Sequence, residues 1–152
     1  MNPRSLACPT IHLEDQLFVA ILKAADSLSQ EADQLIKAAG LTAAQYNVLR
    51  ILRGAEPDGL PCSGIGERMI SRDPDMTRLL DRMESHQLIT RERQKADRRV
   101  IKTRITPEGL KVLKKLDQPV HDLHKKQFRQ MTAARMKQLA ELLVEVEKRE
   151  PL

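Results

Sequence analysis

Residues 88–105 are the segment in which polar and apolar side chains alternate, and this alternation limits what the chain can fold into. A period of two is typical of a half-buried strand. The sequence predicts a first strand over 88–94, a tip over 95–99 and a return strand over 100–105. Before and after this segment, apolar residues recur at three- and four-residue steps, the spacing of amphipathic helices. The pattern therefore predicts a mostly helical fold with one small β-hairpin.

Long amphipathic helices are predicted at both ends of the chain. The first covers residues 11–39, with Thr10 as its N-cap and Gly40 as the left-handed residue that ends it. Two more cover 107–149, and Pro119 should kink or divide the first of these. The stripe expected to face inward on the last helix consists of Met136, Leu139, Leu142, Leu143 and Val146. The long stripe of the first helix must also be buried somewhere, and a partner subunit is one place for it.

Shorter helices are predicted between the first helix and the hairpin. Thr42 and Gln45 have the spacing of a capping box, which marks the start of a helix that ends near Gly54. A short helix follows over 62–70. The next is predicted over 74–86, with Asp73 as its cap and a proline in its first position. The order is four helices, a hairpin and two helices.

Positive charge is concentrated in the predicted hairpin. The stretch 91–104 holds seven basic and two acidic residues, so it carries the same net charge as the whole chain, +5. Such an excess favours a polyanionic partner. Aromatic residues make up only 2% of the chain, too few for the stacking platforms of modules that bind RNA or single strands. A nucleic-acid partner is therefore expected to be a duplex.

Two short helices joined by a turn and followed by a basic hairpin describe a winged helix-turn-helix. The second helix of such a pair fits the major groove of B-DNA, and the hairpin tip reaches the adjacent minor groove, where narrow sites attract arginines. The residues that this interpretation assigns to DNA contact are Asp75, Thr77, Arg78, Arg82, Arg91, Lys95, Asp97, Arg98 and Arg99.

Three motifs of the chain together resemble the MarR family of transcriptional regulators. They are Thr77-Arg78-Leu79-Leu80-Asp81-Arg82-Met83, Leu88-Ile89-Thr90-Arg91, and Asp97-Arg98-Arg99 followed by Ile105-Thr106-Pro107-Glu108-Gly109. The resemblance covers nearly the whole chain, with one departure: the family usually has glycine where this chain has Gln87. If Gln87 must be left-handed, the strain costs about 1 kcal/mol.

The resemblance implies one domain over residues 1–152 and an intertwined helical homodimer. Segments 11–39 and 107–149 would form the dimer, and 41–106 the winged DNA-binding region. Thr77 and Arg78 would read the major groove, while Arg99, positioned by Asp97 and with Arg98 beside it, would enter the minor groove. The implied function is a repressor that binds an inverted repeat of double-stranded DNA, with a possible small-molecule effector.

The same sequence also allows other interpretations of the hairpin, of one helical face and of a cysteine. The basic hairpin could serve a protein partner instead of DNA, and weak dependence of binding on salt would favour that. Asp117, His121 and His124 share a helical face and could hold a metal ion. Cys8 could be a redox-sensing thiol. No motif of a hydrolase, zinc protease, phosphate loop or dinucleotide site is present, so we expect neither an enzyme nor a cofactor.

The same sequence bears on where the protein works. No run of apolar residues is long enough for a membrane span, and the first ten residues lack the apolar stretch of a secretory signal. The two cysteines form no paired motif, which fits a reducing compartment. We expect a cytoplasmic protein with no membrane contact.

Overall fold

The computed structural model describes residues 12–71, 73–94 and 99–148. The elements in chain order are α1 (Leu13–Ala38), α2 (Ala43–Gly54), β1 (Leu60–Pro61), α3 (Cys62–Gly66), α4 (Met76–Ser85), β2 (Ile89–Arg93), β3 (Ile101–Ile105), α5 (Pro107–Gln127) and α6 (Ala133–Glu147). The predicted order of four helices, hairpin and two helices is confirmed, with one short strand added. The fold class, mostly helical with a small β-sheet wing, is confirmed as well.

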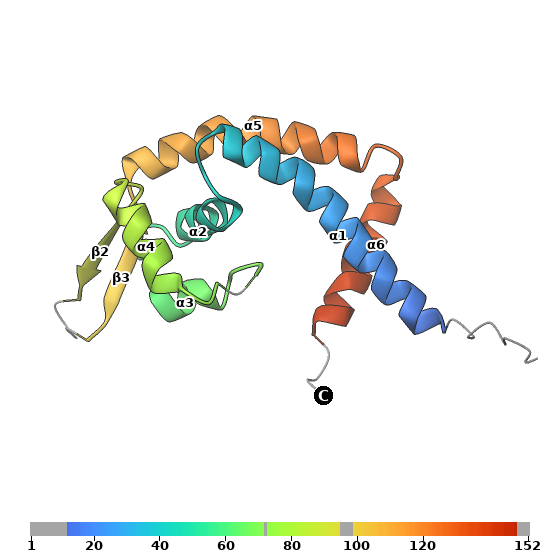
Figure 1. Ribbon diagram of the computed structural model, residues 1–152, viewed down its shortest axis with the longest axis horizontal. Helices are drawn as coiled ribbons and strands as arrows, with labels where there is room; N and C mark the ends of the chain where they lie inside the picture. The colour runs from blue at the N-terminus through green and yellow to red at the C-terminus, as the bar shows by residue number, and fades with distance from the viewer. Residues whose placement is uncertain (1–11, 72, 95–98, 149–152) are drawn as a thin grey trace, which may run out of the picture.

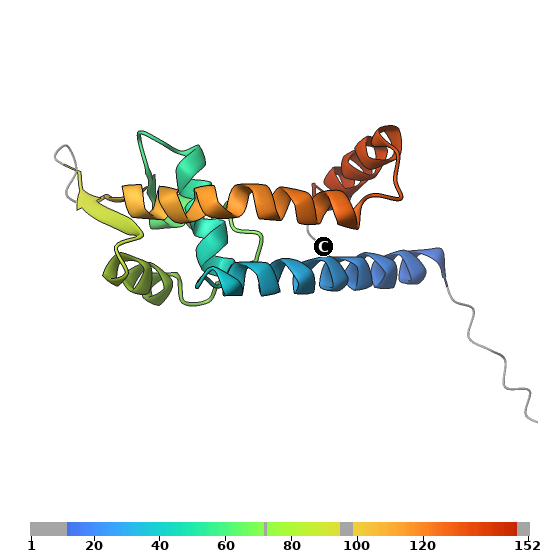
Figure 2. The same ribbon diagram turned by 90° about the horizontal axis from the view of Figure 1, so that it is seen from above.

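The molecule is extended, with a compact lobe at one end and an open helical arm at the other (Figure 1). Helices α2, α3 and α4 and the sheet form the lobe. Helices α1 and α5 run side by side from the lobe into the arm, as a second view shows (Figure 2). Helix α6 lies in the arm, facing α1 across a cavity. None of the described helices combines the length and apolar character needed to cross a lipid bilayer.

Local sequence sets where α1 and α2 end and begin. Helix α1 starts after His12, which provides no side-chain cap, while the predicted cap Thr10 lies outside the described residues. Gly40, at φ 81°, ends it as predicted. The capping box of α2 is confirmed: the N–H of Thr42 donates to Oε1 of Gln45 at 2.9 Å, and the N–H of Gln45 donates to Oγ1 of Thr42 at 3.2 Å.

Helix α4 begins two residues later than predicted. The expected cap, Asp73, instead accepts the N–H of Asp75 at 2.8 Å, so the backbone is still turning at Pro74. The cap is Asp75, whose Oδ1 accepts the N–H of Arg78 at 3.2 Å. The prediction failed because two aspartates compete for this role and the second one lies next to the helix.

The sheet has three strands in the order β1-β3-β2, all antiparallel, where the sequence predicted only a hairpin. Strand β1 pairs Leu60 with Thr103, a threonine that is almost fully buried. Gly59 allows this approach, because at φ 69° it is left-handed and an added Cβ would lie 2.6 Å from the carbonyl oxygen of Thr103. A side chain there would push β1 off the sheet.

The hydrophobic core lies in the lobe, where α2 packs beneath α5. The side chains with no exposed surface are Val48, Leu49, Leu52, Ile65, Met83 and Leu113. Helix α1 contributes only Ile36 to the buried set, and α6 contributes nothing. The stripe of α6 that was predicted to face inward is therefore exposed within a single chain.

Helix α5 runs without a break through Pro119, so the predicted division of this helix is wrong. A proline removes one backbone hydrogen bond from a helix interior. Here the ring lies on the exposed face, and Leu116 and Val120 on the inner face remain buried. Packing of that inner face keeps the helix continuous.

Candidate nucleic-acid interface

Helix α4 presents one buried and one polar face. Leu79, Leu80 and Met83 are buried against the lobe, with contacts to α2 and α3. The opposite face carries the exposed polar side chains of Thr77, Arg78, Asp81, Arg82 and Ser85. Because α3 and α4 follow one another in the chain, are joined by the short segment 67–75 and contact one another, the pair has the arrangement of a helix-turn-helix. The polar face of α4 is thus available to a groove.

Arg78 lies at the start of this face and is held by Asp75, the N-cap residue of α4. Its Nε is 3.1 Å from Oδ2 of Asp75, and its side chain is 78% exposed. The capping carboxylate therefore both starts the helix and orients a guanidinium at the helix end. Asp75, a predicted DNA contact, is half-buried and occupied in this way.

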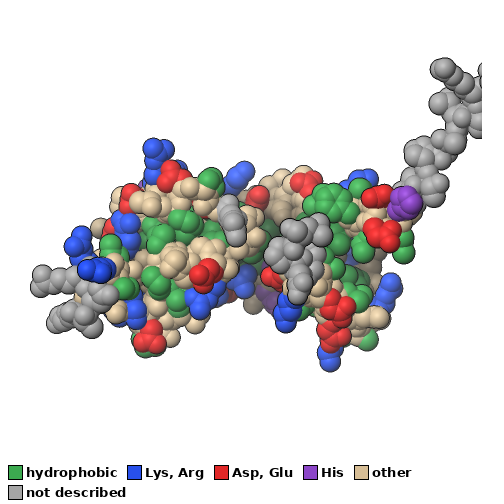
Figure 3. All heavy atoms as spheres, turned by 90° about the horizontal axis from the view of Figure 1, so that it is seen from below, with side chains coloured by type: hydrophobic (Ala, Val, Ile, Leu, Met, Phe, Trp, Pro, Cys, Tyr) green, Lys and Arg blue, Asp and Glu red, His purple; other side chains and the backbone are tan. Residues whose placement is uncertain are grey.

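The hairpin of β2 and β3 forms the wing and projects from the lobe (Figure 1). Arg93 and Arg99 are exposed near its tip, and Figure 3 shows blue basic side chains around this end of the molecule. Three predicted contacts at the tip, Lys95, Asp97 and Arg98, lie outside the described residues. Arg104 of β3 pairs across the wing with Glu92 of β2, its Nη1 lying 3.5 Å from Oε2 of that carboxylate.

Arg91 has partners that the sequence interpretation did not foresee. Its Nε lies 2.9 Å from Oε2 of Glu84, and its Nη2 lies 2.6 Å from that oxygen and 2.5 Å from Oδ1 of Asp81. The hydrogen bond to Glu84 raises the pKa of the Arg91 guanidinium above its ordinary value; partial burial opposes the rise and Asp81 adds to it. Both carboxylates belong to α4, so this arginine of the wing is paired with the helix.

The connection from α4 to the wing passes through a left-handed residue. Gln87 has φ 59°, as the departure from glycine at this position suggested. The N–H of Gln87 donates to the carbonyl of Glu84, and the N–H of Leu88 donates to that of Met83, which is the hydrogen-bond pattern of a Schellman cap. The Thr106 hydroxyl donates to the carbonyl of Gln87 at 2.6 Å. These bonds hold the strained turn in place.

The side chains considered as metal ligands do not come together in the part of the chain that the structure describes. Asp117 accepts two hydrogen bonds from Arg53, each of 2.9 Å, and so is engaged with α2. Within the described ranges, no three His, Cys, Asp or Glu side chains lie close enough to hold a metal ion, which includes His121 and His124. Cys8 falls outside the described residues.

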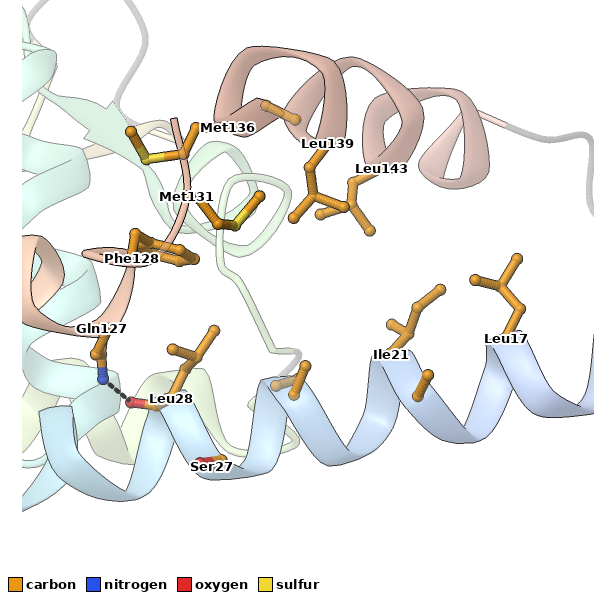
Figure 4. A pocket seen from close by; sticks show the side chains of 14 residues that line it. Leu17, Ile21, Ser27, Leu28, Gln127, Phe128, Met131, Met136, Leu139 and Leu143 are labelled. Atoms are coloured by element: carbon orange, nitrogen blue, oxygen red, sulfur yellow. Dashed lines mark hydrogen bonds between the residues drawn. The ribbon is translucent and has the colours of Figure 1, made fainter. Parts of the chain in front are cut away.

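The arm carries a large apolar cavity between α1, the α5–α6 connection and α6. Its volume is about 790 Å³. Figure 4 shows Leu17, Ile21 and Leu28 of α1 pointing across it towards Leu139 and Leu143 of α6, with an aromatic ring and methionine side chains at the end next to the α5–α6 connection. The outer faces of both helices also expose large hydrophobic side chains.

Sequence reasoning missed two features of this surface. One is Glu84, which was not assigned a role although it lies one helical turn from Asp81 and so shares a face with it. The other is β1, whose two residues include a proline and give no periodic signal. The spacing of Glu84 relative to Arg91 carries information only once the turn between them is known.

Known regulators of transcription are similar to this chain in sequence. A sequence model of the MarR family matches residues 41–101. The chain is 28% identical over 133 residues to the homoprotocatechuate degradative operon repressor of Escherichia coli, covering 88% of each chain.

Solved structures resemble the fold over most of its length. A MarR transcription factor from Planctomyces limnophilus is 32% identical, with a TM-score of 0.67 over 87% of this chain and 96% of that one. BpsR of Bordetella bronchiseptica, whose DNA binding is regulated by 6-hydroxynicotinic acid, has a TM-score of 0.80 at 19% identity, covering 91% and 98% of the two chains. The described helices and wing therefore have counterparts in regulators of transcription.

Proposed function

The chain belongs to the MarR family, and from this premise we propose that it represses transcription by binding a specific duplex sequence as an effector-responsive homodimer. It is a DNA-binding regulator. The observation that carries the finer proposal is that α4 and the wing lie together at one end of the lobe (Figure 1), and that both expose polar or basic side chains there. A helix in the major groove and a wing at the adjacent minor groove need this juxtaposition.

Base recognition is assigned to the exposed face of α4. Thr77 and Arg78 lie in its first turn, where residues of a recognition helix reach base edges. A guanidinium can donate two hydrogen bonds to guanine, and a threonine can bond to a base or touch a thymine methyl. Arg82 is one turn further along. The ion pair with Asp75 holds the Arg78 guanidinium at the start of α4.

The wing supplies the minor-groove contact. We assign it to Arg99, with Arg98, Lys95 and Asp97 of the tip beside it. The exposed position of Arg99 at the start of the return strand supports this assignment. A narrow minor groove concentrates negative potential and so favours an inserted arginine.

Selection from random duplex DNA, followed by binding measurements on the selected sequence, tests these assignments. Arg78→Ala should relax the preference at one base position by about 1–3 kcal/mol, and Arg99→Ala should weaken binding by at least ~1 kcal/mol. Lys148→Ala, at the far end of α6, is the matched control and should bind like the parent. Isotherms of Arg99→Ala and the parent that superimpose would remove Arg99 from the interface.

The homodimer is supported by the apolar surfaces of the arm. Soluble monomers rarely expose a contiguous apolar patch of more than a few hundred Å². Here α1 and α6 both expose large hydrophobic side chains, and an open apolar cavity separates them. We assign residues 11–39 and 107–149 to dimer contacts and 41–106 to DNA binding, within a single domain of residues 1–152. Helices of a second copy would cover the exposed stripes.

Sedimentation at micromolar concentration tests this proposal. The parent should sediment as a dimer, and Leu143→Glu should shift it to the monomer because it places a charge on the apolar face of α6. Ile70→Glu is the control: that side chain is 86% exposed, lies in the lobe and should leave the dimer intact. A parent that sediments as a monomer would contradict the assignment.

A small-molecule effector is the remaining part of the proposal. The relative from Escherichia coli represses an operon for homoprotocatechuate degradation, and DNA binding by the Bordetella protein is regulated by 6-hydroxynicotinic acid. Both compounds are therefore suitable first probes. An effector should lower the affinity for the selected duplex without lowering the unfolding midpoint. If neither compound changes the affinity for the selected duplex, the proposal that such an effector controls repression would be contradicted.

A further inference from the structure

We propose that Arg91 is a positioning residue that clamps the wing onto the recognition helix, in place of the direct DNA contact that its position in the basic stretch suggested. The inference rests on the proposed function, because it concerns how the wing and α4 engage one duplex together. The segment between α4 and β2 is three residues long and includes left-handed Gln87. The clamp closes this short segment.

The donors of Arg91 are directed at α4. Its backbone N–H donates to Oε1 of Glu84 at 3.2 Å, while its Nε and Nη2 both donate to Oε2 of the same carboxylate. Nη2 also reaches Asp81. The side chain of Arg91 is 24% exposed, compared with 78% for Arg78 on the face of α4. With Nε and Nη2 both bound to carboxylates of α4, the guanidinium has only its Nη1 group left to offer a phosphate.

The position of Arg91 along β2 explains why a clamp is needed there. Ile89 is buried, Arg91 is half-buried and Arg93 is exposed, so burial on this face of β2 decreases towards the tip. Arg91 pairs with buried Thr103 of β3, so holding it also holds the return strand. Beyond this rung the two strands project from the lobe. The clamp therefore sets the angle at which Arg99 meets DNA.

Charge gives the clamp a second consequence. Asp81 and Glu84 would repel a nearby duplex, and the single positive charge of Arg91 offsets one of these two negative charges through close ion pairs. Removing Glu84 takes a negative charge away from the recognition helix. Electrostatics alone would then tighten DNA binding. If the carboxylate is needed to hold the wing, the same change weakens binding, so the two roles predict opposite signs.

The first test measures binding of full-length Glu84→Ala to the selected duplex. We expect affinity to fall at least about fivefold, the equivalent of losing a wing contact worth ~1 kcal/mol. The control is Glu92→Ala, an exposed carboxylate of the same hairpin, which should bind equally or more tightly. Parent-like or tighter binding by Glu84→Ala would overturn the clamp. A parent that binds no duplex would overturn the proposed function and, with it, this inference.

The second test uses Arg91 itself and guards against simple misfolding. Arg91→Lys keeps the charge and the aliphatic stem but not the planar fork, so a phosphate contact would survive and the clamp would not. We expect Arg91→Lys to weaken binding at least about fivefold in the parent but less than about twofold in Arg99→Ala, because without Arg99 the wing position no longer matters. Equal losses in both backgrounds would show an independent contact and refute the clamp.

Discussion

Gly109 lies in the first turn of α5 at the point where the helix touches the base of the wing. A Cβ at this position would be 2.4 Å from the carbonyl oxygen of Leu88, 2.8 Å from Cγ1 of Ile105 and 3.2 Å from a methyl of Leu49. The nearest atom is backbone and so cannot rotate away. It also accepts the N–H of Thr106 at 3.1 Å, which ties it to the N-terminus of α5. Gly109→Ala must therefore displace a strand or a helix.

Three effects set the expected size of the change. Overpacking of a close contact costs up to about 3 kcal/mol. Displacing the Leu88 carbonyl weakens its hydrogen bond, worth about 1 kcal/mol. Alanine gains about 1 kcal/mol over glycine in a helix interior. Since the unfavourable terms exceed the helix gain, Gly109→Ala should destabilise the protein by about 2–3 kcal/mol.

Urea unfolding followed by circular dichroism measures this change, at one protomer concentration for every variant because a dimer's stability depends on concentration. Gly54→Ala is the matched control, since that glycine ends α2 and its added Cβ would meet nothing within 4 Å. It should stabilise by about 0.5–1 kcal/mol. Two variants that shift the midpoint in the same direction would refute the reasoning about close contact.

Gln87→Gly should stabilise the fold by about 0.5–1 kcal/mol in the same urea assay because it relieves a left-handed side chain; a loss of stability would show that the side chain makes a contact worth more than the strain. Thr106→Val removes both the cap of α5 and the bond to the carbonyl of Gln87, and the thermal midpoint should fall by the equivalent of about 1–2 kcal/mol. Ile65→Ala removes the single buried residue of α3 and should cost about 2–5 kcal/mol, whereas exposed Ile70→Ala should change stability by less than about 0.5 kcal/mol; similar losses from both would contradict the burial of α3 through Ile65.

The sequence predicted the elements that have a strong periodic signal. The hairpin, the helix order and the capping box at Thr42 were all legible because alternation, helical spacing and capping chemistry depend on near neighbours. The start of α4 could not be predicted in this way, since Asp73 and Asp75 can both cap a helix and tertiary packing decides between them. Strand β1 was missed because two residues carry no period, and it exists only through its pairing with β3.

The candidate site was predictable in outline. Exposed Thr77, Arg78 and Arg82 follow from the apolar face of α4, which fixes the opposite one. The partners of Arg91 do not follow from the sequence, since they depend on how a left-handed turn returns the chain over α4. The exposed stripe of α6 shows a different limit: an amphipathic pattern says that a face will be covered, but not whether its own chain covers it.

Two copies of this chain should bind one duplex together through α4 and the wing. The decisive experiment is a titration of the selected duplex over a range of salt concentrations, with the mass of the complex measured alongside. We predict a complex of two chains and a log–log slope of about −5 or steeper, as expected when roughly six phosphates are contacted. Failure to bind any duplex at low ionic strength, or binding that does not change with salt, would contradict the account.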